Sequence, residues 1–132
     1  MPVSNACPFP GVIALADGIK NNGALVKFDI SDNNLRADGG KALAGALKNN
    51  NIMKELNIAS NKLGENSSYD ADMSGVLAIC DAIPTMGALE TITFGDKQAV
   101  TMQTIMTEAD FSGKELGASG AMIVAAFLPK CQ

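Results

Sequence analysis

Carboxylates and thiols are the side chains best suited to chemistry in this chain, because its 132 residues include no histidine. The three cysteines, Cys7, Cys80 and Cys131, lie far apart, so none has the short spacing of a zinc-ligand or redox pair. Two carboxylates can act as a general acid and base only in a dry cleft that shifts their pKa values. No pattern indicates such a cleft, or a nucleophile beside a base. The sequence therefore predicts no enzyme, no cofactor and no metal site.

Two short motifs look like ligand loops but lack essential residues. The stretch 29–34 begins like a calcium loop, yet Asn34 stands where the turn glycine belongs and Gly40 where the bidentate glutamate belongs. The stretch 39–42 looks like a phosphate loop, but it lacks the first glycine and the hydroxyl residue after Lys41. We expect neither stretch to bind its ligand.

Charge and hydropathy exclude two classes of partner. The net charge of −4 and a pI near 4.6 argue against nucleic acid, since phosphate binding needs clustered Lys and Arg. No apolar run reaches the length of a membrane span, and residues 1–20 lack the basic start and long apolar core of a signal peptide. With an odd number of cysteines, this predicts an intracellular, reducing compartment, either the cytosol or an organelle interior.

A repeat of 28 residues organises the chain. Its first copy is Leu25-x-x-Phe28-x-Ile30-x-x-Asn33-x-Leu35, and its second is Met53-x-x-Leu56-x-Ile58-x-x-Asn61-x-Leu63. A weaker copy places Phe111, Leu116 and Gly120 81 residues after Ile30, Leu35 and Gly39. Such a period is typical of stacked supersecondary units, each made of a strand and a helix.

The elements follow from hydrophobic periodicity and from the breakers Asn, Gly and Pro. We expect an extended lead-in over 1–10 and one domain over 11–132, with insertions near 65–72 and 95–105. Helices are predicted at 11–22, from 38 to 48, from 73 to 83 and from 118 to 128, and strands at 25–30, 54–58 and 89–94. The segment 95–105 is predicted to be an extra extended arm that replaces a helix.

The repeated asparagines, Asn33 and Asn61, are predicted to hydrogen-bond backbone groups of neighbouring coils, because an inward polar side chain must be satisfied. The corresponding positions in the third and fourth units are Lys97 and Lys114. We therefore expect the asparagine ladder to stop after two coils.

The pattern L-x-x-L-x-L-x-x-N-x-L, followed by an Ala/Leu-rich helix, is similar to leucine-rich repeats, and the period resembles the ribonuclease-inhibitor type in particular. The resemblance implies an α/β fold, a short leucine-rich-repeat solenoid of about four units with parallel strands on the concave face and helices on the convex face. It also implies a protein that binds other proteins and is rarely catalytic.

On such a sheet the outward side chains form rows that a partner can contact. The expected concave-face residues are Lys27, Asp29, Ser31, Glu55, Asn57, Thr91, Thr93, Glu108 and Asp110, joined by Ala59, Gly95 and Ser112. Four carboxylates against one lysine favour a basic partner. The alternative is a solvated sheet face without a fixed ligand.

The insertions and the last helix are further candidate contacts. They contribute Tyr69 and Asp70 in the first insertion, Val100 and Met102 in the second, and Met122 and Phe127 in the helix. Residues 121–128 are all apolar, and a solenoid end of that kind must be covered. The cover is a symmetry mate, a different subunit or a neighbouring part of this chain, and we expect a protein partner.

Three functions are compatible with these patterns. The first is a non-enzymatic interaction or assembly module, a structural subunit of a larger complex, with a hetero-complex favoured over a homo-oligomer. The second is a regulator or inhibitor that binds a basic protein through the concave face. The third is a piece of a longer repeat protein.

Overall fold

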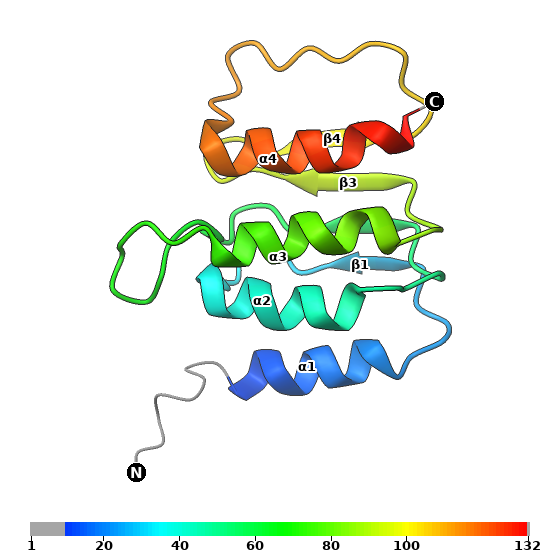
Figure 1. Ribbon diagram of the computed structural model, residues 1–132, viewed down its shortest axis with the longest axis vertical. Coiled ribbons are helices and arrows are strands. Elements are labelled where there is room, and N and C mark those ends of the chain that lie inside the picture. The colour runs from blue at the N-terminus through cyan, green and yellow to red at the C-terminus, as the bar shows by residue number, and fades with distance from the viewer. Residues whose placement is uncertain (1–9, 132) are drawn as a thin grey trace.

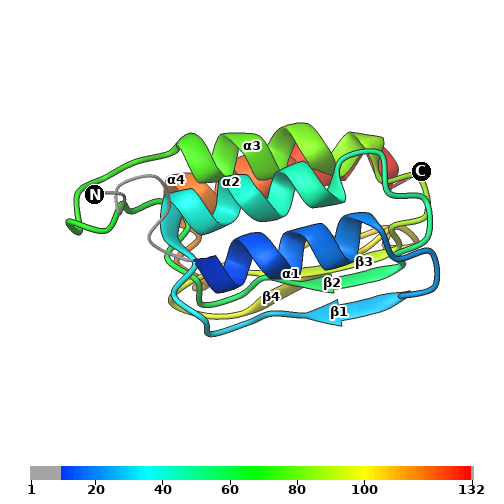
Figure 2. The same ribbon diagram turned by 90° about the horizontal axis from the view of Figure 1, so that it is seen from below.

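The structure, a computed structural model, describes residues 10–131, and these form an α/β fold. In chain order the elements are α1 (Pro10–Lys20), β1 (Lys27–Asp29), α2 (Arg36–Leu47), β2 (Glu55–Asn57), α3 (Ser74–Ala82), β3 (Thr91–Phe94), β4 (Val100–Gln103) and α4 (Gly117–Phe127), with short 3-10 turns η2 (Ile83–Thr85) and η3 (Leu128–Lys130). The helices lie side by side in one layer, stacked from α1 to α4 (Figure 1), and the strands form a second layer beneath them (Figure 2).

The sheet is mixed, with strand order β1-β2-β3-β4. β1, β2 and β3 are parallel, and their register aligns Lys27 with Glu55 and Thr91. β4 instead runs antiparallel to β3 as the second arm of a hairpin. The predicted extra extended arm at 95–105 is therefore confirmed, whereas the expectation that all strands are parallel is wrong at the fourth strand.

The helices agree with the predicted ones to within a few residues. α1 begins at Pro10, one residue inside the predicted lead-in, because proline suits the first turn of a helix. The rest of that lead-in, residues 1–9, lies outside the described residues. α2 begins at Arg36 rather than at residue 38, and α3 begins at Ser74, next to the expected start.

The repeated apolar positions fill the core between the two layers. Leu35, Leu56 and Ile58 are almost completely buried, as the repeat predicts. Leu25, the first position of the first copy, is exposed because it lies at the open end of the stack, before β1. The apolar period thus identifies the inward face of each strand, and position in the stack decides how much of it is covered.

The backbone itself repeats with the sequence. The Asn22 side-chain oxygen accepts the N–H groups of the second and third residues after it, Ala24 and Leu25. Asn50, 28 residues later, accepts the N–H groups at the same two spacings. Left-handed residues also recur at matching positions, namely Asp32 and Asn34, Ser60 and Lys62, and Gly113 and Glu115. The weaker copy therefore shares the turn conformation of the first two.

Asn61 confirms the predicted link between coils. Its amide donates to the Ile30 carbonyl of the preceding coil, and its carbonyl accepts the Asn33 N–H. In the third unit no asparagine follows, but the Asp96 carboxylate accepts the Lys62 N–H at 3.0 Å. The link continues with a different side chain, which the comparison of Asn positions did not reveal.

Candidate functional site

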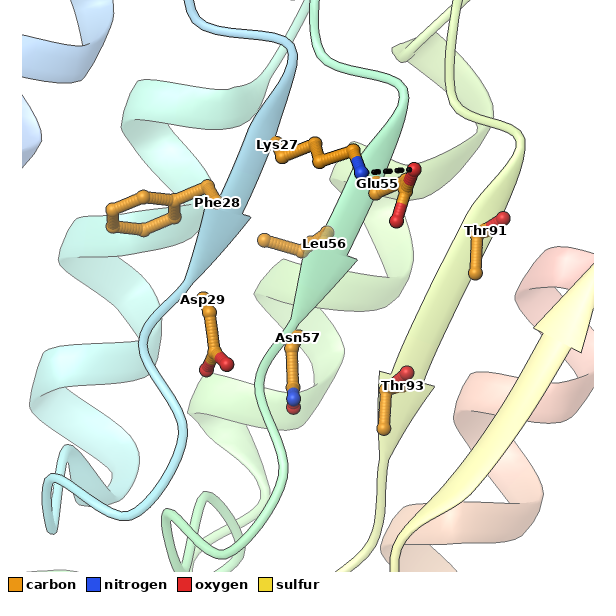
Figure 3. Close-up of a pocket in the computed structure, with 8 residues that line it drawn as sticks. All are labelled: Lys27, Phe28, Asp29, Glu55, Leu56, Asn57, Thr91 and Thr93. Carbon is orange, nitrogen blue, oxygen red and sulfur yellow. Dashed lines mark ion pairs between the residues drawn. The ribbon is translucent and has the colours of Figure 1, made fainter.

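The face of the sheet that points away from the helices carries the candidate site. Side chains alternate along each strand, so Lys27 and Asp29 are exposed while Leu56 and Ile92 on the neighbouring strands face the core. This face is shallowly hollowed, with a volume of about 330 Å³ (Figure 3). The hollow is lined by Lys27, Phe28, Asp29, Glu55, Leu56, Asn57, Thr91 and Thr93. Six of the nine predicted concave-face residues therefore lie together.

The charged groups of the hollow come from β1 and β2. The Lys27 ammonium lies 3.4 Å from the Glu55 carboxylate, and both side chains are well exposed, so this ion pair contributes little stability. The Ser31 hydroxyl and N–H both donate to Asp29, which holds the pKa of that carboxyl below its usual value, with a smaller contribution from Asn57. Asp29 is therefore a fixed anion at neutral pH.

The other half of the hollow is uncharged. Thr91 and Thr93 lie on β3, and the Thr93 hydroxyl is 2.9 Å from the Thr101 hydroxyl on β4. The face thus changes from charged groups at β1 and β2 to hydroxyl groups at β3 and β4. Such a surface can form hydrogen bonds with a partner across its full width.

Glu108 and Asp110 do not lie on the sheet, which corrects the prediction for the fourth unit. β4 pairs with β3 along the edge that a fourth parallel strand would need, so residues 104–116 form a loop beyond α4 (Figure 1). Asp110 keeps only the local turn, since its carboxylate accepts the Ser112 N–H as Asp29 accepts that of Ser31. The Ser112 hydroxyl and N–H likewise lower the pKa of Asp110.

Three apolar candidates for partner contact are core residues instead. Val100 and Met102 occupy the inward positions of β4, and Phe127, the last residue of α4, is fully buried. These side chains offer no surface to a partner, which corrects the prediction for them. Met122 is only partly buried.

The same chain covers part of the apolar end at α4. Met106 and Phe111, in the loop 104–116, pack against the core cluster. Leu128 remains 45% exposed. Neighbouring parts of this chain thus supply cover, since Val100 and Met102 of the 95–105 arm lie in the same core cluster as Phe127, and the loop after the arm packs against that cluster.

The insertion 65–72 is held in place by Arg36, which the sequence did not single out. The Arg36 guanidinium lies 3.2 Å from Glu65 and stacks 4.6 Å from the centre of the Tyr69 ring. Tyr69 is still 72% exposed, and the neighbouring Asp70 is exposed as well. The available signal was the repeat itself, because Arg36 stands where the later copies have Gly64 and a second glycine.

Among residues 10–131, no group of three or more His, Cys, Asp or Glu side chains is placed to hold a metal ion. Within the same residues, no helix is long and apolar enough to cross a membrane. Comparison with known proteins found no match to a family model, a curated protein or a solved structure.

Proposed function

We propose that this chain is a short leucine-rich-repeat solenoid of the ribonuclease-inhibitor type that works as a non-enzymatic protein-interaction module, a subunit of a larger hetero-complex. The solenoid assignment is supported by successive strand–helix units with a 28-residue period and three parallel strands in register. The hydrogen bonds of Asn61 between adjacent coils support it as well.

The observation that carries the function is the hollow sheet face. Its outward polar side chains come from three adjacent strands, and no described segment covers them. Concave sheet faces are the usual binding surfaces of solenoids, because they present many side chains at fixed spacing. We assign the main partner contact to this face.

The corrected positions change the expected partner. With Glu108 and Asp110 absent from the sheet, the face carries two carboxylates and one lysine, and that lysine is already paired. The remaining lining side chains are largely hydroxyl and amide groups. We therefore favour a polar, hydrogen-bonding protein surface as the partner. A strongly basic partner is less favoured, because the face has two of the four expected carboxylates.

The C-terminal helix is the weaker docking candidate. Phe127, its largest side chain, is buried in the core of this chain, and the loop 104–116 covers part of that end. An apolar anchor of an interface must be accessible before binding. The sheet face thus has more support than α4.

A matched pair of substitutions tests this assignment. Thr91→Arg places a bulky charge in the hollow, whereas Thr107→Arg makes the same change in the exposed loop 104–116. Tagged chains are recovered from the native source, and the amount of co-purifying protein is measured. We expect this amount to fall at least about tenfold with Thr91→Arg and to stay unchanged with Thr107→Arg. Equal retention by both variants would contradict the sheet-face assignment.

A further inference from the structure

β1 is an edge strand, and one row of its backbone groups has no partner within residues 10–131. The bonds to the β2 side use even-numbered residues, since Val26 accepts from β2, and Ile30 donates to the Asn57 carbonyl. The backbone N–H and C=O groups of Lys27 and Asp29 therefore point to the open edge. Figure 2 views the molecule from this end, with β1 as the nearest strand. Such an edge is a template for pairing with another strand.

Apolar side chains gather at the same end of the stack. Leu25 and Val26, directly before β1, are 36% and 44% exposed, and Leu15 on α1 is 40% exposed. Phe28 is only partly buried. β4, at the opposite end of the sheet, is the other edge strand, so the choice of β1 rests on its charge pattern.

Two copies of β1 carry complementary charges when they pair in antiparallel orientation. When two copies of β1 pair in antiparallel fashion, their outward backbone groups can hydrogen-bond only if odd-numbered residues of one copy lie directly opposite odd-numbered residues of the other. The register centred on Phe28 opposes Lys27 to Asp29 of the second copy twice, and each of these pairs exchanges two N–H···O bonds.

The neighbouring registers are disfavoured by charge. A shift by two residues in one direction opposes Lys27 to Lys27 of the second copy, and a shift in the other direction opposes Asp29 to Asp29. Like charges directly opposite each other destabilise a strand pair. The sequence Lys-Phe-Asp therefore selects one two-fold register.

We propose that a second copy of this chain docks at β1, forming an antiparallel two-fold strand pair centred on Phe28. The interface is isologous, as in most symmetric dimers, and joins the two sheets into one. Lys27 then lies between Glu55 of its own chain and Asp29 of the second copy. The proposal does not rest on the sheet-face function, because the strand pair uses the backbone edge of β1. The Lys27 and Asp29 side chains that select its register also line the hollow.

A charge-exchange experiment tests the register directly. Sedimentation equilibrium of the full chain over a concentration series should show a mass approaching twice 13.6 kDa. Lys27→Asp opposes two aspartates, and Asp29→Lys opposes two lysines, so each variant alone should dimerise at least about tenfold more weakly. Mixed in equal amounts, the two variants should form a heterodimer, because each lysine then faces an aspartate.

The mixture also controls for folding, since restored pairing requires both variants to be folded. Glu108→Lys, a charge reversal in the loop 104–116, should dimerise like the unmodified chain. A monomer at every concentration would overturn the proposal, and slow amide exchange of Lys27 and Asp29 in that monomer would show that another part of the chain covers the edge. Dimers that persist in both single variants, or a mixture that stays monomeric, would also overturn it.

Discussion

Asn61 is predicted to be far more important for stability than Asn33, although the two occupy the same position of the repeat. The Asn61 side chain is fully buried. Its amide donates to the carbonyls of Ile30 and Ile58 at 3.0 and 3.1 Å, and its carbonyl accepts the N–H groups of Asn33 and Leu35 at 2.8 and 3.4 Å. It thus satisfies backbone groups of two adjacent strand–helix units at once.

The expected cost follows from the groups that lose their partner. In Asn61→Ala the Ile30 carbonyl keeps a bond from Asn33. The N–H groups of Asn33 and Leu35 and the Ile58 carbonyl lose the partner that Asn61 supplied. A buried backbone group without a partner costs about 1–3 kcal/mol, so we expect a loss of about 3–5 kcal/mol. That is a large share of the roughly 5–15 kcal/mol that stabilises a domain.

Asn33→Ala is the matched control. The Asn33 side chain is exposed and donates to carbonyls within its own turn, those of Ile30 and Ser31. Because water can replace these bonds, we expect a loss of about 1 kcal/mol. Urea unfolding followed by circular dichroism measures both free energies. The reasoning is refuted if the two variants lose similar amounts, or if Asn61→Ala loses less than Asn33→Ala.

Three further predictions concern packing, pH and thiol reactivity. Gly75→Ala should lower the free energy of unfolding by about 2–3 kcal/mol, because its methyl group would lie 2.6 Å from a backbone oxygen of α2. Gly45→Ala, whose methyl group meets open space within α2, should raise that free energy by up to about 1 kcal/mol. Thermal or urea unfolding measures both. The hydroxyl and N–H of Ser74, which begins α3, lower the pKa of Asp72. The stability that Asp72 contributes to the fold is therefore present above the unfolded pKa near 4 and is lost as the pH falls below that value. Asp72→Asn should therefore melt lower than the unmodified chain at pH 7, and the gap should close near pH 2; a gap independent of pH would contradict this. Burial, helped by a nearby aspartate, raises the pKa of the Cys80 thiol. In a variant whose single cysteine is Cys80, maleimide at pH 8 should therefore label the folded chain more slowly than the chain unfolded in urea. Equal labelling rates would contradict this.

The features that could be predicted are those that follow from residue types and their spacing along the chain. The 28-residue period identified the buried positions Leu35, Leu56 and Ile58, and it identified Asn61 as a link between coils. Alternation along the strands also placed Lys27 on the outer face. These features follow from side-chain periodicity and from turn chemistry, which the sequence contains in full.

Two segments of the chain were candidates to pair with the free edge of β3. Both 100–103 and the segment around Phe111 carry alternating residues, and one edge accepts only one strand. The hairpin that forms β4 closes a short loop, 95–99, which costs less conformational entropy than a longer connection. Its pairing removed Glu108 and Asp110 from the sheet, although their turn still repeats that of the first unit.

The sequence by itself determined the repeat, the inward and outward positions of β1 to β3, and the turns that join them, because each follows from residue types and their spacing along the chain. Only the tertiary structure decided that Phe127 is buried, that Arg36 holds the Tyr69 loop, and that β1 has an open edge. These depend on which segments meet in space. The residue pattern indicates which strands can pair, but only the packed fold shows which strand edges remain unpaired.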